Sequence, residues 1–211
     1  VLNNSRDPRI RRLTLESLSN QPDKGTKIEY SILKAISDED EGIRSLALDM
    51  SLSMNIWIKN LKNNRTPLTQ RMCLKALNDS SERIRSKAAF YTLRLPSGWY
   101  KDSSPVALAG FAKNPYLTIK DRTEVSNLLV EHKDFRVRYA LASNSAIKNP
   151  LVIEKLSKDL SPAVRAVLSL NSNKSSEVEK RLSQDSNALV LYLLSISCSH
   201  ENSQVLRNLI Q

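Results

Sequence analysis

Arginine is the residue type whose spacing in this chain points most clearly to a chemical role. Five arginines share one local pattern, with an acidic or small polar residue four positions earlier and Ile or Val directly before: Arg11, Arg44, Arg85, Arg138 and Arg165. A guanidinium can donate paired hydrogen bonds to a carboxylate or a phosphate. Because equivalent residues of repeated units usually hold the units together, the pattern predicts a structural ladder that binds acids or carbonyls of adjacent units. The alternative is a stripe of cations that binds phosphates.

A second basic group lies between residues 55 and 101, where ten Lys and Arg residues stand against two acidic residues. The net charge of the whole chain is +10, so this stretch carries most of it. Cations interleaved with aromatic rings are typical of nucleic-acid surfaces, because cations neutralise phosphates and rings stack on bases. The candidate residues for binding a nucleic acid or an acidic partner are Lys59, Lys62, Arg65, Arg71, Lys87, Trp99 and Tyr100.

The same stretch has a plainer interpretation, a solvated basic face with Phe90 and Trp57 in the core. Pro96, Gly98 and Pro105 exclude a continuous helix around Trp99. Residues 96–104 are therefore predicted to form an inserted loop. Such a loop either presents Trp99 and Tyr100 to a partner or lets Trp99 fill the junction between two types of repeat.

The sequence offers little for catalysis. His132 and His200 are far apart and have no partner at the spacing of metal ligands or of a catalytic triad. Carboxylates such as Asp38 and Asp79 occur at the ends of repeats, where helix capping explains them. With only 4 Gly, the chain has few residues for the loops that cradle phosphate. We therefore expect no catalytic residue, no metal ion and no cofactor.

The cysteine content and the hydropathy pattern predict a cytoplasmic chain without membrane association. Cys73 and Cys198 cannot form a framework of disulfides, so both are predicted to be buried thiols in a reducing compartment. No apolar run approaches the roughly 18 residues of a membrane span. The sequence opens on Val1, without the pattern of a signal peptide.

Internal repeats determine the expected fold. Residues 33–47 and 74–88 align without a gap at an offset of 41, and nine of the fifteen positions are identical. The spacings between successive pattern arginines are 33, 41, 53 and 27, and the long one divides into 23 and 30 if Leu108 takes the equivalent position. A degenerate sixth copy over 186–190 places Val190 at the arginine position. The first residue of each clear copy is a predicted helix N-cap: Asp7, Asp40, Ser81, Asp134 and Ser161.

A second register appears in the C-terminal half, where Asn114, Asn144 and Asn171 follow three alignable segments. Asn tolerates the left-handed conformation of a helix C-cap, so each is predicted to end a helix. Apolar periodicity between the caps, such as Ile43 with Ala47 and Met50, predicts the buried faces of the helices. The expected helices span 8–20, 26–37, 41–54, 67–78, 82–95, 105–113, 121–131, 135–143, 150–158, 162–170, 175–183, 187–198 and 202–210.

Repeats of about 25–41 residues with helical patterns indicate an all-α superhelix of stacked helix pairs. The pattern resembles the HEAT-like repeat superfamily over nearly the whole chain, and the shorter units with Asn at the helix end resemble leucine-rich repeat variant units. The resemblance implies one α-solenoid over residues 1–211, with longer helix-pair repeats at 1–95, the inserted loop at 96–104 and shorter repeats at 105–211. It also implies a right-handed superhelix whose second helices line the concave face.

The function expected of such a chain is that of a non-catalytic interaction scaffold. Its curved basic surface would bind a macromolecule, either a nucleic acid or an acidic protein. One alternative is a HEAT-like DNA-repair glycosylase acting on alkylated bases, which the basic charge and the two tryptophans resemble in general plan. A further alternative is a structural subunit of a larger assembly. The sequence leaves the oligomeric state open.

Overall fold

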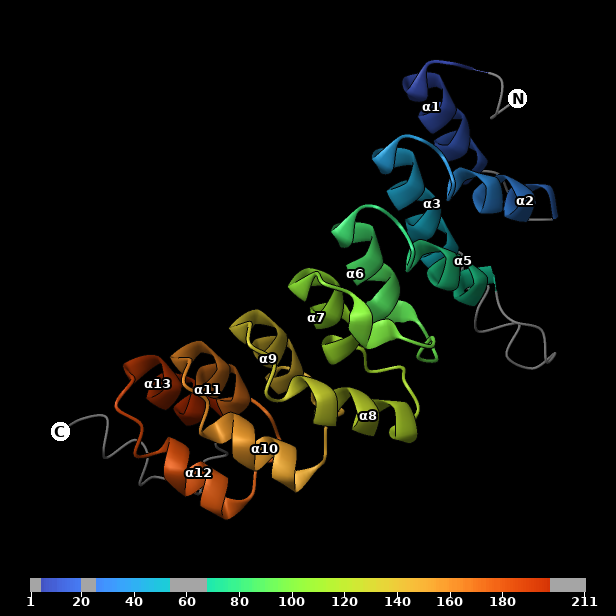
Figure 1. Ribbon diagram of the computed structural model, residues 1–211. Coiled ribbons are helices and arrows are strands. Elements are labelled where there is room, and N and C mark those ends of the chain that lie inside the picture. Colours follow the sequence, from blue (N-terminus) through green and yellow to red (C-terminus); the bar gives the residue numbers. More distant parts are fainter. Residues whose placement is uncertain (1–4, 20–25, 54–67, 198–211) are drawn as a thin grey trace. The chain divides into compact units, whose positions relative to one another are not determined.

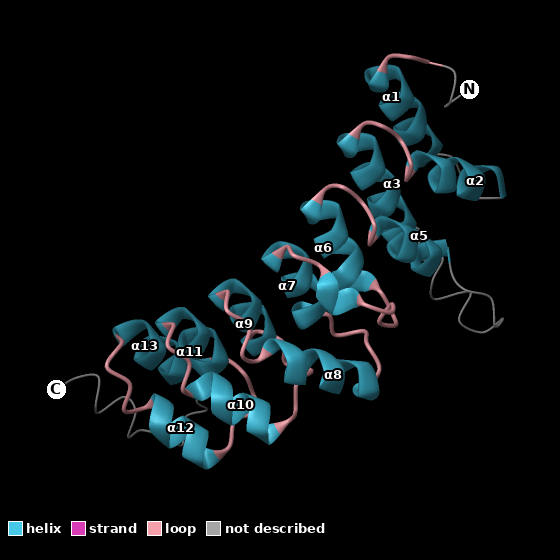
Figure 2. Ribbon diagram, viewed as in Figure 1, coloured by secondary structure: helices cyan, strands magenta, loops and turns pink. Residues whose placement is uncertain are grey.

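The computed structural model describes residues 5–19, 26–53 and 68–197 (Figure 1). Within these ranges the chain forms twelve α-helices and one short 3-10 helix, with no strand, so the fold class is all-α (Figure 2). The α-helices are α1 (Pro8–Ser19), α2 (Thr26–Ala35), α3 (Glu41–Ser53), α5 (Leu68–Ala76), α6 (Glu82–Tyr91), α7 (Pro105–Lys113), α8 (Ile119–Leu129), α9 (Phe135–Ala142), α10 (Pro150–Ser157), α11 (Pro162–Ser169), α12 (Ser176–Leu182) and α13 (Ala188–Ser197).

The predicted helices agree with these elements closely, and the expected helix at 202–210 lies outside the described residues. The largest difference is at the end of α6, which was predicted to reach residue 95 but ends at Tyr91. Thr92 is in an extended conformation and fully buried, and its hydroxyl accepts a hydrogen bond from Gln70 Nε2 at 3.2 Å. The helix therefore ends four residues earlier than predicted, at a buried residue that is held by a tertiary contact.

The chain divides into two compact units, residues 1–92 and 93–211. The boundary lies three residues before the predicted change from longer to shorter repeats. In the first unit, α3 packs against both α1 and α6. Helix α2 packs on α3, and α5 packs on both α3 and α6. Apolar residues at helical spacing fill the space between them, and the predicted stripe of Ile43, Ala47 and Met50 is confirmed as buried.

The second unit has two rows of helices. In one row α9 packs on α7, α11 on α9, and α13 on α11; in the other, α10 packs on α12 (Figure 1). The largest fully buried side chains of this unit are Leu141, Ile153, Leu156, Leu168, Leu182 and Leu194. The helices α10 and α12 are only 8 and 7 residues long, whereas α8 has 11 residues.

The predicted inserted loop contains one turn of 3-10 helix, η2 (Trp99–Lys101). Gly98 precedes this turn with φ +72°, a left-handed conformation that a residue with a side chain rarely adopts. The chain then enters α7 at Ser104, whose hydroxyl accepts a hydrogen bond from the backbone N–H of Ala107. Gly98 and the Ser104 cap therefore set the path by which Trp99 is placed.

The predicted helix caps are confirmed in part. The carboxylates of Asp7, Asp40 and Asp134 accept hydrogen bonds from backbone N–H groups of their own first helical turn. Ser81 and Ser161 also stand at the N-cap positions of α6 and α11, as predicted, but neither hydroxyl accepts a hydrogen bond from its helix. Ser81 Oγ instead donates to Glu41 Oε1 at 2.7 Å.

Asn114 ends α7 as predicted, but its backbone is extended, with φ −66° and ψ 113°, and not left-handed. Its amide oxygen instead accepts a hydrogen bond from the backbone N–H of Tyr116 at 2.7 Å. Asn therefore serves this position through its side chain, which closes the turn after α7, rather than through backbone conformation.

Candidate binding residues and the arginine rungs

The five pattern arginines make the same contact with their own helix entry. Arg44 Nη1 donates to the carbonyl oxygens of Asp38 at 3.0 Å and Glu39 at 2.9 Å, six and five residues earlier. The other arginines repeat it at the same sequence distances: Arg11 with Ser5 and Arg6, Arg85 with Asp79 and Ser80, Arg138 with His132 and Lys133, and Arg165 with Asp159 and Leu160. The guanidinium is thereby oriented by residues of its own repeat.

The rest of the guanidinium reaches a carboxylate of the following repeat. Arg44 Nε and Nη2 donate to Asp79 Oδ2 and Oδ1 at 2.7 and 3.0 Å. Three further bidentate pairs have the same form, and they are Arg11–Asp38, Arg138–Asp159 and Arg165–Asp185. The Arg44 and Asp79 side chains are 12% and 5% exposed, so this link is largely shielded from solvent. We call each such arginine–aspartate pair a rung.

The aspartate of each rung also closes its own turn. Asp79 Oδ1 accepts a hydrogen bond from the backbone N–H of Ser81 at 2.8 Å, and Asp38, Asp159 and Asp185 accept from the residue two positions later. Burial alone would raise the pKa of Asp79, but the hydrogen bonds from Arg44 and from the Ser81 N–H outweigh it and lower that pKa. The hydrogen bond from Arg165 likewise lowers the pKa of Asp185. The charged forms of Asp79 and Asp185 are thus favoured in the folded protein.

Leu108 and His132 replace a rung between α7 and α9. Leu108 is 4% exposed and stands where the other copies have arginine, six residues after Asp102. His132 stands where the other copies have aspartate, and its Nδ1 accepts the hydrogen bond from the backbone N–H of Asp134 at 3.1 Å. Leu108 at the arginine position cannot bind a carboxylate, and the aspartate position is correspondingly occupied by His132, which still accepts the hydrogen bond that closes the turn.

The degenerate sixth copy was predicted one residue out of register. Asn187, not Ser186, caps α13, because its side chain accepts a hydrogen bond from the backbone N–H of Leu189. Val190 is fully buried and takes the position of the Ile or Val of the pattern. Leu191, rather than Val190, therefore stands at the arginine position.

The candidate residues of the basic stretch do not share one role. Lys59, Lys62 and Arg65 lie outside the described residues. Arg71 is exposed on α5, and Tyr100 is exposed on η2 in the other unit. Lys87 differs from the expected free cation, because its Nζ donates to both carboxylate oxygens of Asp49 at 2.8 and 2.9 Å. A phosphate or carboxylate of a partner would have to displace that pair.

Trp99 does not expose its ring, which differs from the interpretation in which the loop presents it to a partner. Its side chain lies in the second unit, its exposure is 5%, and its ring packs against Phe111 with the centroids 5.1 Å apart. The indole Nε1 donates to Glu124 Oε1 at 2.9 Å. The burial leaves no free face for stacking on a base, and the glycosylase alternative therefore loses one of its two aromatic residues.

A second ladder connects the shorter repeats, at asparagines that the sequence predicts only as helix ends. Asn144 is 5% exposed, and its Nδ2 donates to the carbonyl oxygens of Ala112 at 2.9 Å and Asn114 at 3.3 Å in the preceding repeat. Asn171 Nδ2 donates to Ala142 in the same way at 3.4 Å. The signal for this ladder was in the sequence, because each of the three asparagines stands six residues after a rung position.

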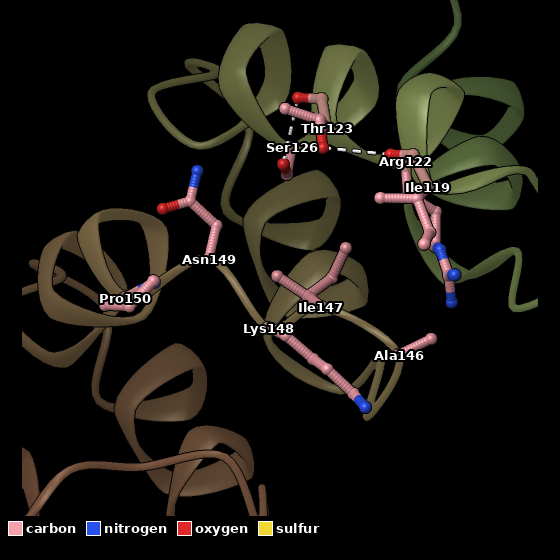
Figure 3. A pocket seen from close by; sticks show the side chains of 9 residues that line it. All are labelled: Ile119, Arg122, Thr123, Ser126, Ala146, Ile147, Lys148, Asn149 and Pro150. Carbon is pink, nitrogen blue, oxygen red and sulfur yellow. Dashed lines mark hydrogen bonds between the residues drawn. The ribbon is translucent and has the colours of Figure 1, made fainter.

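A pocket of about 330 Å³ lies in the second unit between α8 and the segment that leads into α10 (Figure 3). Its lining combines apolar side chains with two cations, and comprises Ile119, Arg122, Thr123, Ser126, Ala146, Ile147, Lys148, Asn149 and Pro150. The pocket was not predicted, because its residues come from a helix and a loop that each have the composition of an ordinary surface. Its one sequence signal is the length of α8.

No protein-family model matches the sequence, and no curated protein matches it either. Over the described ranges, none of the helices combines the length and the apolar character that crossing a membrane requires.

Proposed function

We propose that this chain is a non-catalytic interaction scaffold, built as a HEAT-like α-solenoid, whose basic surface binds an acidic macromolecule. The observation that carries the proposal is the rung, because one set of contacts recurs at Arg11, Arg44, Arg138 and Arg165. Recurrent contacts between successive helix pairs are typical of repeat proteins, in which each repeat packs on its neighbours and the stacked surface binds partners.

The charge of the chain supports an acidic partner. The rungs use their arginines internally, so the net charge of +10 must be carried largely by other cations. Exposed lysines and arginines occur on several helices of both units, among them Lys34 on α2, Arg71 on α5, Lys113 on α7 and Lys180 on α12. A surface of this sign attracts polyanions and accelerates their association.

Among polyanions, we favour an acidic protein over a nucleic acid. The burial of Trp99 and the pairing of Lys87 with Asp49 remove two of the contacts on which the nucleic-acid interpretation depended. An acidic polypeptide needs complementary charge but no stacking platform.

The test is binding of fluorescent duplex DNA, single-stranded DNA, RNA and polyglutamate, measured by anisotropy over a salt series. We expect polyglutamate to bind with an affinity that falls as salt rises. Tighter binding of any nucleic acid, with a slope of about −0.9 log units per phosphate contact on duplex DNA, would make the nucleic acid the partner class. Failure of all four probes to bind at low salt would contradict the proposed scaffold for acidic macromolecules.

The solenoid itself is tested by small-angle X-ray scattering. A compact domain of this length has a radius of gyration of about 17 Å. Stacking of all repeats into one superhelix predicts a clearly larger value and an elongated pair-distance distribution. A value near that of a compact sphere would contradict the superhelix while leaving the helix pairs within each unit intact.

A further inference from the structure

We infer that the pocket between α8 and residues 146–150 binds a segment of acidic polypeptide, with one apolar side chain of the segment inside the pocket and its carboxylates on Arg122 and Lys148. This inference rests on the proposed function and names its site and the chemistry of its partner. All nine lining residues belong to the second unit.

The pocket exists because α8 is longer than the helices that follow it in its row. In this repeat, His132, which closes the turn, stands 18 residues after the buried Asn114. The corresponding separation is 15 residues in the next repeat (Asn144 to Asp159) and 14 in the one after it (Asn171 to Asp185). The additional residues extend α8 at its N-terminal end, to Ile119. That extra turn has no counterpart at the start of α10, so a hollow is left beside the segment 146–149.

The wall of the pocket is aliphatic. Ile119 is 78% exposed although it lies on the pocket, and Ile147 forms part of the wall with an exposure of 3% (Figure 3). Ala146 and Pro150 add two small apolar surfaces. An apolar side chain of a partner that enters here removes this surface from water, which favours binding.

Arg122 and Lys148 supply unmatched positive charge at the pocket. Their cationic ends extend to the same side of Ile147 in Figure 3. Neither side chain has a hydrogen bond or an ion pair with any residue in the described part of the chain. On neighbouring α10, by contrast, Lys155 pairs with Glu131 and Lys158 pairs with Glu154. A carboxylate of the partner could form ion pairs with these two cations, which have no acidic partner in the described part of the chain.

The polar groups of the pocket favour a peptide over a nucleotide. Thr123 Oγ1 already donates to the Ile119 carbonyl and Ser126 Oγ to the Thr123 carbonyl, as the dashed lines of Figure 3 show. The Asn149 side chain caps α10 by accepting from the Leu151 N–H. The nine lining residues include no aromatic ring, so a base would find neither a stacking partner nor free hydroxyl donors.

The experiment measures anisotropy of two fluorescein-labelled peptides on the full chain. One peptide alternates Glu with Leu over eight residues, and the other replaces each Leu by Gly. The pocket variant is Arg122→Gln/Lys148→Gln. The matched control is Lys113→Gln/Lys133→Gln, which removes the same charge from two exposed residues of the same unit that do not line the pocket. Circular dichroism melts verify that both variants remain folded.

We expect the Glu–Leu peptide to bind more tightly than the Glu–Gly peptide. The pocket variant should weaken it about tenfold, since two charge-assisted contacts are lost, and the control should weaken it less than about twofold. Ile119→Ser should abolish the preference for Leu over Gly while leaving the binding of the Glu–Gly peptide unchanged.

Equal losses in the pocket variant and the control would overturn the inference in favour of diffuse attraction, and the scaffold proposal would stand. A loss of single-stranded DNA binding in the pocket variant, with peptide binding unchanged, would overturn it in favour of a nucleic-acid site. If neither peptide nor polyglutamate binds the unmodified chain, the proposed function fails together with the inference.

Discussion

The two units of the chain link their repeats by the same rung but support it in different ways. In the first unit, Arg44 reaches Asp79 across 35 residues, and the intervening α5 is nine residues long. In the second, Arg138 reaches Asp159 across 21 residues, and α10 is eight residues long. The second unit adds buried asparagines that bond to the preceding repeat, at positions where the first unit has Ser17, Met50 and Tyr91.

The difference shows that the rung is independent of repeat length. Its geometry is set by two short local turns, one that orients the arginine and one that orients the aspartate, so the helices between them can shorten. Shorter helices bury less apolar surface, and the buried amide groups of Asn144 and Asn171 offset part of that loss with hydrogen bonds between repeats.

Acid should have the largest effect, because it acts on the rungs of both units at once. Hydrogen bonds from Arg165 lower the pKa of Asp185, and in Asp38 and Asp79 the hydrogen bonds from the arginines and turn N–H groups outweigh the opposing effect of burial. A lowered folded-state pKa contributes stability that is complete above the unfolded value of 3.8 and is lost as the pH falls through the folded value.

The free energy of unfolding should therefore be level above about pH 5 and fall progressively below it. The loss should continue to about pH 2, because Arg136 lowers the pKa of Asp134 to about 2. Urea titrations between pH 7 and pH 2 measure this directly. A stability that rises as the pH falls from 5 to 3 would exclude the ionic rungs as a stabilising feature.

Removal of one rung in the first unit should have the next largest effect. Arg44→Ala leaves the carboxylate of Asp79, 5% exposed, without its cation and should cost about 3 kcal/mol. Arg44→Lys keeps the charge but not the bidentate geometry, so it should cost less. Thermal melts of both variants measure these losses, and Arg71→Ala, at an exposed residue, serves as the control. An unchanged melting temperature of Arg44→Ala together with a loss of binding would show that the guanidinium binds a partner and does not link repeats.

The second ladder should be visible only in the second unit. Asn144→Ala removes hydrogen bonds to the carbonyls of Ala112 and Asn114 and from the N–H of Ala146, at an expected cost of about 2 kcal/mol. Hydrogen exchange should accelerate in α7 and α9 and remain unchanged in α3. The control Asn78→Ala, at an exposed residue of the first unit, should change neither. Uniform acceleration across both units would show that the difference between them is not a difference in local stabilisation.

The pair at Leu108 and His132 allows one repeat type to be converted into the other. Arg138→Leu alone leaves Asp159 buried without its cation, whereas Arg138→Leu/Asp159→His copies the natural pair and keeps an acceptor for the Ser161 N–H. The double variant should be more stable than Arg138→Leu alone by about 1 kcal/mol. Strict additivity of the two single losses in denaturant titrations would show that the natural pair is not an equivalent of the rung.

The smallest expected effect is that of Trp99→Phe. The substitution retains most of the packing on Phe111 and removes the hydrogen bond to Glu124, so it should cost about 1 kcal/mol. Binding of polyglutamate and of DNA should not change, because the ring is buried. A large loss of single-strand binding without a change in stability would restore Trp99 as a binding residue.

The repeated contacts of the structure could be predicted from the sequence, but the surroundings of most candidate binding residues could not. Positions such as Ile43 and Arg44 were predictable because their roles depend on local spacing, and each copy supports the others. The partners of Lys87 and Trp99 lie 38 and 25 residues away, on other helices, so no local pattern contains them. Cys73 is confirmed as the buried thiol that the low cysteine count predicted, and burial raises its pKa to about 12; Cys198 lies outside the described residues.

The local half of each rung has a consequence for how the chain folds. Nη1 of each arginine is bound to carbonyls only five and six residues away, so the guanidinium is oriented before the following repeat is in place. The rungs then close loops of 20 to 35 residues, which are short for tertiary contacts. Within each unit, folding should therefore be fast. One helix pair at a time would pack onto a neighbouring pair whose arginine guanidinium is already oriented to donate hydrogen bonds.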